Sequence, residues 1–265
     1  MAGTDELARF YEDAYTRDAA DAELYGRWRA LSAAGKADHV VAVCAAEGLA
    51  PASVLDVGCG DGALLSELHR RGFGGRLEGV EIAPAAVEIA RGRPGIAAVQ
   101  LYDGARLPHA GGSFELGVLS HVLEHVADPV AVLSETARVC AAVVVEVPLE
   151  ANWSARRESK LEHAAEVGHI QRLDRDAVHG IAAGAGLRVA AELQDPLPRR
   201  VQRFFARTPS ERARADARWA VRASLHRLSP SLARRVFTVH FACLLVPHSV
   251  LVPHSVLVPH SVPVR

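Results

Sequence analysis

The stretch SVLDVGCGDGA at residues 53–63 decides the fold. Residues 53–57 are a short apolar run of β-type residues, three glycines follow within the next five positions, and residues 63–71 place leucines on one helical face. Glycines in such a loop let the backbone approach a ligand closely, and the helix that follows offers free N–H groups at its N-terminus. The stretch therefore predicts a strand, a ligand-binding glycine loop and a helix.

The same alternation of strands and helices continues along the chain. The strands lack in-and-out alternation, which indicates burial on both faces, and the intervening helices indicate crossover connections. We expect an α/β fold, a doubly wound and mostly parallel seven-stranded Rossmann-like sheet whose last strand is an antiparallel edge strand. The expected strands are 53–57, 77–82, 96–101, 114–119, 142–147, 187–193 and 237–246, and the expected helices are 5–15, 22–33, 37–47, 63–71, 84–91, 129–137 and 174–184.

Composition shifts divide the chain into regions. Residues 1–40 are expected to be helical and 41–246 to form the α/β domain, in which 150–171 is a polar loop. Within that domain, 194–235 is expected to be a helical insertion, because residues 199–235 hold eleven arginines against two acidic residues. The tail at 247–265 continues a threefold LVPHSV repeat, with a proline every sixth position, and is expected to be disordered or loosely attached.

Overall composition excludes several classes of protein. The 265 residues carry a formal net charge of −1, which gives no support for binding DNA or an acidic membrane through overall charge. The four cysteines form no C-x-x-C pair, so neither a zinc knuckle nor a disulfide framework is indicated. The first residues are polar and no apolar run reaches about 20 residues. A cytoplasmic protein is expected.

Polar side chains follow the strands where the ligand of such a sheet binds. Asp56 and Glu81 stand at the ends of the first and second strands, Asp103 follows the third, and Ser120 and His121 follow the fourth. An ionised acid accepts hydrogen bonds, so these positions suit ribose hydroxyls, an exocyclic amine and an amino group. Together they describe a site for ribose, adenine and an amino acid head group.

The glycine pattern alone leaves a second cofactor open. Residues 58–63 fit the loose fingerprint G-x-G-x-x-A, in which Gly58, Gly60 and Ala63 would bind NAD(P). An NAD(P)-dependent oxidoreductase is therefore the alternative enzyme class.

The ordered set of motifs resembles the class I S-adenosylmethionine-dependent methyltransferases over roughly residues 40–193. The resemblance implies that residues 56–62 hold the methionine part of S-adenosylmethionine, that Glu81 binds the ribose, and that Ile82 packs on the adenine while Asp103 binds its amine. Cys59, Gly104 and Ser120 belong to the same expected cofactor site. The resemblance also implies that residues 1–40 form a helical lid over the cofactor, which the domain at 41–246 binds. The motifs that carry the resemblance are VLDVGCGDG at 54–62, Glu81, Asp103, SFEL at 113–116 and SHVLEH at 120–125.

Two histidines are candidate general bases for methyl transfer. His121 lies just beyond the fourth strand, and His169 lies in the polar segment where related enzymes hold the acceptor. Residues 121–125 also spell H-x-x-E-H, the pattern of inverted zinc peptidases. We expect Glu124 and His125 to fix the loop instead, and we expect no metal.

The acceptor is expected to be a small molecule methylated on oxygen or nitrogen. The segment after the fourth strand lacks the proline-proline-aromatic run of nucleobase amino-methyltransferases, and no cysteine stands where a cytosine methyltransferase needs one. The scarcity of lysine suggests a high-GC genome and, with it, secondary metabolism. The arginine-rich stretch is interpreted as a solvated surface, although it would also suit an anionic acceptor or RNA. A catalytically silent cofactor-binding module is the non-enzyme alternative.

Overall fold

The computed structural model describes residues 4–16 and 19–248. The expectation of a disordered LVPHSV tail concerns residues that lie mostly outside this range. No helix in the described part of the chain is long and apolar enough to cross a membrane.

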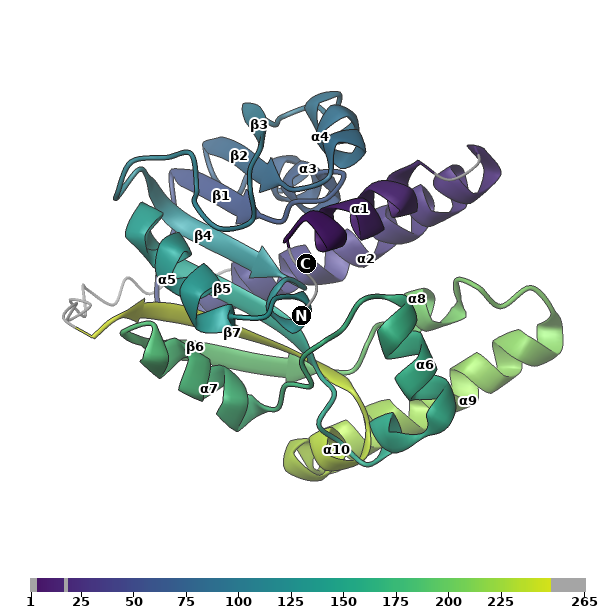
Figure 1. Cartoon of the computed structure of the whole chain (residues 1–265). Helices are drawn as coiled ribbons and strands as arrows, with labels where there is room; N and C mark the ends of the chain where they lie inside the picture. Colours follow the sequence, from purple (N-terminus) through teal and green to yellow (C-terminus); the bar gives the residue numbers. More distant parts are fainter. Residues whose placement is uncertain (1–3, 17–18, 249–265) are drawn as a thin grey trace, which may run out of the picture.

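Seven strands form one sheet in the order β3-β2-β1-β4-β5-β7-β6 (Figure 1). Strands β3, β2, β1, β4 and β5 are parallel, as predicted, whereas β7 runs antiparallel to both of its neighbours. The strands are β1 (Ser53–Val57), β2 (Arg76–Glu81), β3 (Ala98–Leu101), β4 (Phe114–Ser120), β5 (Cys140–Leu149), β6 (Leu187–Asp195) and β7 (Val239–Pro247).

The prediction that the last strand lies at the edge is wrong. Strand β7 pairs with β5 on one side and with β6 on the other, so β6 is the edge strand. The reason is visible in the side chains: the residues of β7 are almost all buried, while most of β6 is only partly buried. A nearly unbroken apolar run suits an interior strand that is covered on both faces.

Helices cover both faces of the sheet and build two hydrophobic cores. On one face, apolar residues of α2, α3 and α4 pack together, and on the other those of α5 and α7 do so. Asp128 and Asp174 accept hydrogen bonds from the first turns of α5 and α7, as N-caps do. The helices of the two layers are α2 (Ala19–Ala46), α3 (Ala63–Arg70), α4 (Pro84–Arg91), α5 (Pro129–Val139) and α7 (Arg175–Gly184).

The N-terminal region differs from its prediction. Helix α1 (Thr4–Tyr15) is as expected, but the two helices expected at 22–33 and 37–47 are one continuous 28-residue helix, α2. The boundary that we expected after residue 40 therefore falls inside α2. Gly35 lies inside α2, and a Cβ placed there would make an ordinary van der Waals contact with Pro198 at 3.5 Å.

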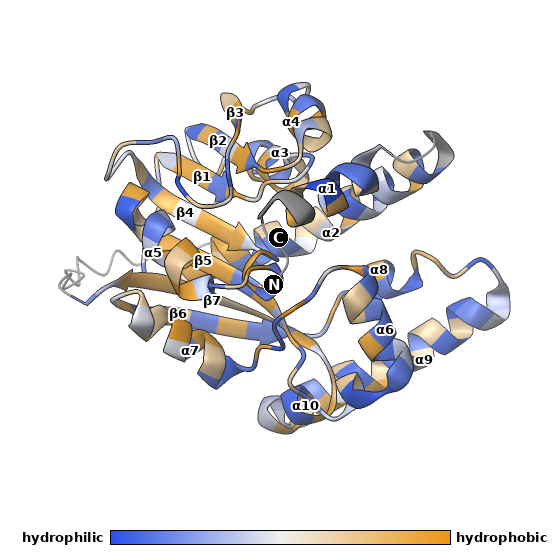
Figure 2. Ribbon diagram, viewed as in Figure 1, coloured by the Kyte–Doolittle hydropathy of each residue, from blue (hydrophilic) through white to orange (hydrophobic). Residues whose placement is uncertain are grey.

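The remaining helices gather beyond the carboxyl ends of β4 and β5 (Figure 1). The segment at 150–171 is not simply a loop: it contains the short η2 (Ser154–Arg156) and the helix α6 (Glu158–Glu166). The arginine-rich insertion is helical, as predicted, and Figure 2 shows the long α9 as mainly hydrophilic against the hydrophobic strands. The insertion comprises α8 (Arg199–Arg203), α9 (Pro209–Leu228) and α10 (Pro230–Val236).

Candidate active site

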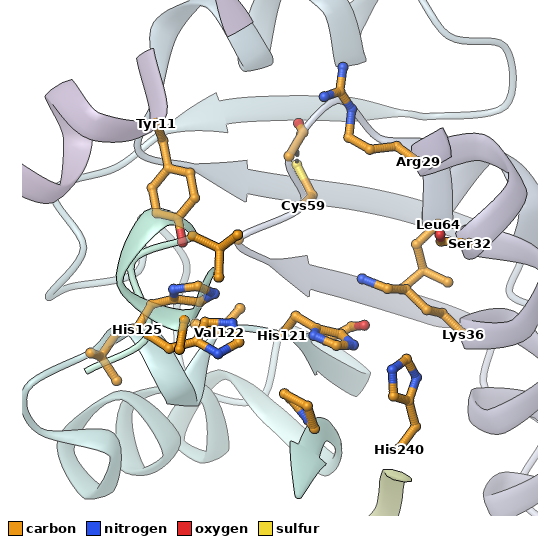
Figure 3. A pocket seen from close by; sticks show the side chains of 18 of the residues that line it. Tyr11, Arg29, Ser32, Lys36, Cys59, Leu64, His121, Val122, His125 and His240 are labelled. Atoms are coloured by element: carbon orange, nitrogen blue, oxygen red, sulfur yellow. Dashed lines mark hydrogen bonds between the residues drawn. The ribbon is translucent and has the colours of Figure 1, made fainter. Parts of the chain in front are cut away.

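One cavity of about 810 Å³ lies beyond the carboxyl ends of the parallel strands. At one end it is lined by the glycine loop after β1, and at the other by residues of α6, the insertion and β7. Figure 3 shows Tyr11 of α1, Lys36 of α2, His121 and His125 directed into the same space. We call the first end the cofactor half and the second end the acceptor half.

The glycine loop has a backbone that only glycine adopts easily. Gly58 and Gly60 have φ values of 75° and 53°. A Cβ at Gly58 would lie 2.8 Å from Val122, and one at Gly60 would lie 2.6 Å from the Tyr15 hydroxyl. The loop therefore leaves its backbone open to the cavity, with α1 folded over it.

Glu81 is the acid at the end of β2, and its side chain holds the glycine loop in place. The carboxylate accepts N–H bonds from Gly60 at 2.8 Å, Ile82 at 2.7 Å and Ala83 at 3.1 Å. Burial raises the pKa of Glu81, and these N–H groups oppose that rise. A carboxylate has about four lone-pair positions, so one remains for a ligand hydroxyl.

Asp56 and Asp61 flank the loop in different electrostatic settings. Asp56 lines the cavity at 2% exposure, and burial raises its pKa to about 7, with Lys36 acting in the opposite direction. Asp61, which lies within the predicted loop 56–62 but was not singled out as a site residue, forms ion pairs with Arg29 at 2.9 Å and Arg93 at 2.8 Å. Asp56 is thus the acid whose ionisation a bound ammonium group would favour, while Asp61 is already paired.

Most of the predicted cofactor residues line the cavity, and two do not. Gly62 packs against α4, because a Cβ there would lie 2.7 Å from Ile96 and 3.1 Å from Ala90. Asp103 is exposed, and its carboxylate accepts the N–H groups of Ala105 and Arg106 within its own loop. The predicted residues that do line the cavity are Asp56, Gly58, Cys59, Gly60, Glu81, Ile82, Gly104 and Ser120.

His121 lies where the two halves meet. Although it is not a glycine, it has a positive φ of 59°. Its Nδ1 lies 3.0 Å from Glu124 Oε1. Its Nε2 is buried and has no hydrogen-bond partner among the described residues. Burial lowers the pKa of His121 to about 4, so the ring is neutral at pH 7.

His169, the second predicted base, also lines the cavity but is held differently. Its Nδ1 lies 2.7 Å from Glu150 Oε2, and its ring lies 4.8 Å from that of His125. Burial lowers the pKa of His169, but the Glu150 carboxylate more than offsets this, and the pKa is raised.

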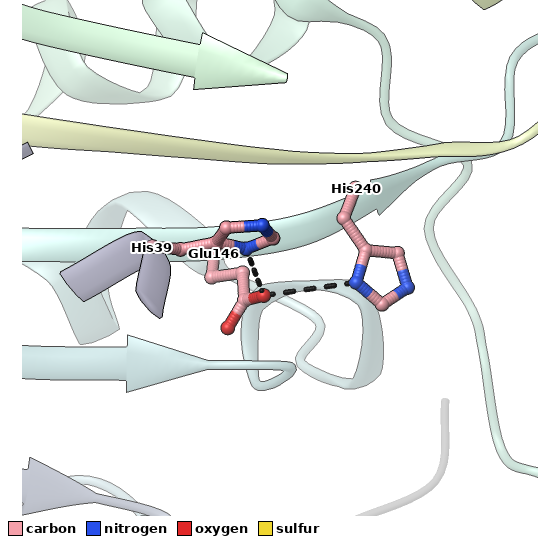
Figure 4. Close-up of side chains that lie close together, drawn as sticks. All are labelled: His39, Glu146 and His240. Carbon is pink, nitrogen blue, oxygen red and sulfur yellow. Dashed lines mark hydrogen bonds and ion pairs between the residues drawn. The ribbon is translucent and has the colours of Figure 1, made fainter. Parts of the chain in front are cut away.

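A buried polar network that the sequence did not reveal borders the cavity, and Figure 4 shows three of its side chains, His39, Glu146 and His240. Glu146 of β5 contacts His39 Nδ1 at 2.8 Å and His240 Nδ1 at 3.7 Å, and it accepts a hydrogen bond from Ser120 at 2.7 Å. Burial alone would lower the pKa of His39, but Asp195 and Glu146 raise it to about 10. The network therefore places a cationic imidazole between two carboxylates.

Several cationic side chains line the cavity. The chain has only two lysines, Lys36 and Lys160, and both line the cavity, as does Arg222 of α9. Burial and the charge of Arg222 lower the pKa of Lys160, and burial with Arg218 lowers that of Arg222. From the sequence, the scarcity of lysine was attributed to genome composition alone, and the position of both lysines at the cavity was not foreseen.

Solved structures share this architecture. The geranyl diphosphate C-methyltransferase from Streptomyces coelicolor A3(2) superimposes with a TM-score of 0.57 at 16% identity, over 80% of this chain and 78% of that one. The cyclase SpnF superimposes with a TM-score of 0.61 at 15% identity, over 92% and 97% of the two chains. At these identities the likeness shows the fold, and a cyclase among the neighbours shows that the fold alone does not fix an activity.

Sequence comparison identifies the family. The ubiquinone biosynthesis O-methyltransferase of Xanthomonas oryzae pv. oryzae is 38% identical over 96 residues, which cover 34% of this chain and 39% of that protein. The family model described as a methyltransferase domain matches residues 25–192, a range that includes the glycine loop, Glu81 and His121. These matches favour S-adenosylmethionine over NAD(P) as the ligand of the glycine loop. The chain belongs to the methyltransferase domain family.

Proposed function

We propose that the protein transfers the methyl group of S-adenosylmethionine to an oxygen or nitrogen of a small acceptor that carries an anionic group. The observation that carries this proposal is the continuous cavity, which joins the glycine loop to Lys160 and Arg222. The names of the ubiquinone and geranyl diphosphate methyltransferases refer to small-molecule acceptors, which supports the same class here. A role in secondary metabolism is part of the proposal.

The residues of the cofactor half fit S-adenosylmethionine. The open backbone of Gly58 and Gly60 would hold the methionine part, Asp56 would accept its ammonium group, and the free lone pair of Glu81 would accept a ribose hydroxyl. Ile82 lines the cavity next to Glu81 and would pack on the adenine. When bound, the cofactor supplies a methyl group that is already activated for transfer.

His121 is the group that would take the proton of the acceptor. His121 lines the cavity, its buried Nε2 has no hydrogen-bond partner among the described residues, and Glu124 Oε1 lies 3.0 Å from its Nδ1. A base must lie within hydrogen-bond reach of the proton it removes, and it contributes typically ~10²–10⁴-fold to the rate. His169 is less suited to the role because Glu150 already engages its Nδ1.

Lys160 and Arg222 would bind the anionic group of the acceptor. Their lowered pKa values arise from burial and from neighbouring cations, so an anion between them would relieve the repulsion. Among the described residues, Arg222 makes a long hydrogen bond of 3.5 Å to Gln202 and lies over the ring of Phe237. Neither neutralises its charge.

The test is a screen with the purified protein, S-adenosylmethionine and pairs of phenols, hydroxyacids and amines that differ only in a carboxylate or phosphate. We expect S-adenosylhomocysteine to form with anionic members, together with a product heavier by one methylene. His121→Asn should lower turnover by about 100-fold or more while cofactor affinity stays unchanged. Preference for the uncharged members of each pair would contradict the anionic acceptor.

A further inference from the structure

Glu124 is a buried carboxylate that lacks hydrogen-bond donors. The residue is 1% exposed, and neither Oε1 nor Oε2 has a hydrogen-bond partner among the described residues. Its nearest partner is His121, whose Nδ1 lies 3.0 Å from Oε1 and whose ring is neutral at pH 7. Burying an ionised carboxylate is costly unless it is paired or coordinates a metal. Its surroundings therefore call for a cation.

Two histidines beside Glu124 each keep a nitrogen lone pair available. His125 Nδ1 lies 3.1 Å from the Gly168 carbonyl oxygen, and His169 Nδ1 lies 2.7 Å from Glu150. Both oxygens only accept hydrogen bonds, so each Nδ1 carries the proton and Nε2 of the neutral ring is free. Metal-bound histidines show this same arrangement, with the second nitrogen donating to a carbonyl or carboxylate.

The three side chains are already held close together. One ligand atom from each of Glu124, His125 and His169 lies within 4.8 Å of the others. The N–H groups of Ile170 and Gln171 donate to the Glu124 carbonyl oxygen at 2.9 and 3.0 Å, which fixes the segment that carries His169 beside the loop that carries Glu124. The two segments that carry the ligands are thus joined through the backbone, and side-chain adjustments would bring the three ligand atoms to metal-binding distance.

We propose that Glu124, His125 and His169 bind a divalent transition-metal ion, with Zn²⁺ as the best match to the ligand set. Two imidazoles and one carboxylate are a set that zinc enzymes use, and they leave a coordination position open. His125 and His169 line the acceptor half, so an oxygen of the acceptor or a water would complete the coordination. That role toward the acceptor rests on the proposed function, whereas metal binding itself does not.

The set differs from the two other arrangements that the chain offers. The zinc-peptidase pattern at 121–125 would use His121 and His125 as ligands, whereas the structure groups His125 with Glu124 and His169. The cluster of His39, Glu146 and His240 is also close-set, but His39 contacts Glu146 through Nδ1 and Asp195 through Nε2. Neither nitrogen of His39 is left free for a metal.

The experiment is titration of chelator-treated full-length protein with Co²⁺, followed by its visible absorption, and then displacement by Zn²⁺. No cofactor or acceptor is present, so failure of the proposed methyl-transfer function would not affect the result. Glu124→Gln, His125→Gln and His169→Gln should each weaken binding by more than about 100-fold, and the outer-partner variant Glu150→Gln by about 10- to 100-fold. His163→Gln, on the cavity wall outside the cluster, is the matched control.

Because the chain also has His248, His254 and His260 in its repeat, a variant with all three replaced by glutamine is a second control. It should bind Co²⁺ as the wild type does. Absence of binding to the wild type, equal binding by the three ligand variants, or loss of binding in the repeat variant would each overturn the proposal. Circular dichroism and S-adenosylhomocysteine binding show whether each variant is folded. If a ligand variant does not fold, Glu150→Gln still tests the metal site.

Discussion

The two halves of the cavity are built in different ways. The cofactor half comes mainly from one short stretch of sequence, the loop after β1, together with the acid that ends β2. The acceptor half brings together residues from α2, the segment after β4, α6, α9 and β7. A family likeness in sequence can therefore predict the cofactor half. The acceptor half depends on segments that meet only in the folded protein. Substitutions should therefore separate the two halves.

The largest expected effect is on the glycine loop. Gly58→Val would place a branched side chain at a φ of 75° and against Val122. A strain of up to about 3 kcal/mol corresponds to about 100-fold weaker S-adenosylhomocysteine binding, measured by calorimetry. Gly186→Val is the matched control, because Gly186 also has a positive φ of 74°, but a Cβ added there would meet no described atom within 4 Å. It should lower the melting temperature and leave cofactor affinity unchanged.

Glu81→Gln should have the next largest effect. The amide presents an NH₂ group where the carboxylate accepts three backbone N–H bonds, so about 1.5–3 kcal/mol of cofactor binding should be lost, or about 10- to 100-fold in Kd. Glu78→Gln changes an acid of the same strand that pairs with Arg76 outside the cavity. Equal S-adenosylhomocysteine affinity in both variants would show that Glu81 does not contact the ligand.

Substitutions in the acceptor half should change the KM for the acceptor and leave the Kd for the cofactor unchanged. Lys160→Met and Arg222→Met should each raise KM for an anionic acceptor by about tenfold, which corresponds to about 1.4 kcal/mol, with no change in cofactor Kd. Arg227→Met on the same helix as Arg222 is the control, since Arg227 is exposed and does not line the cavity. A change in cofactor affinity instead of KM would mean that the two halves are not separate.

The smallest expected effect is on protein stability: the stabilisation contributed by His39 should depend on pH. The groups that face His39 are Glu146 of β5, Asp195 of β6 and His240 of β7. Because its pKa is raised to about 10, the stabilisation is fully present below the unfolded value of about 6.5 and is lost as the pH rises through about 10. His39→Gln should cost about 1 kcal/mol at neutral pH, and denaturant unfolding should show a smaller difference near pH 10. A difference that does not change with pH would show that His39 is uncharged.

Local sequence patterns predicted much of the fold and half of the site. The alternation of strands and helices, the glycine loop and Glu81 all depend on neighbours within about 30 residues. The contact of His39 with Glu146 joins residues 107 positions apart, so no periodicity reveals it. Asp103 was placed by resemblance, yet its carboxylate bonds its own loop. The continuous apolar run of β7 does indicate an interior strand, although the position of β7 at the end of the chain favoured an edge.

The most direct test of the central claim is a crystal structure of the protein with S-adenosylhomocysteine. We predict that the ligand occupies the half of the cavity beside Gly58 and Gly60, with its ribose hydrogen-bonded to Glu81 and its sulfur facing His121. The space between His121 and Arg222 should stay open to an acceptor. A ligand whose sulfur faces away from His121, or one that fills the space up to Lys160 and Arg222, would contradict the division of the cavity into a cofactor half and an acceptor half.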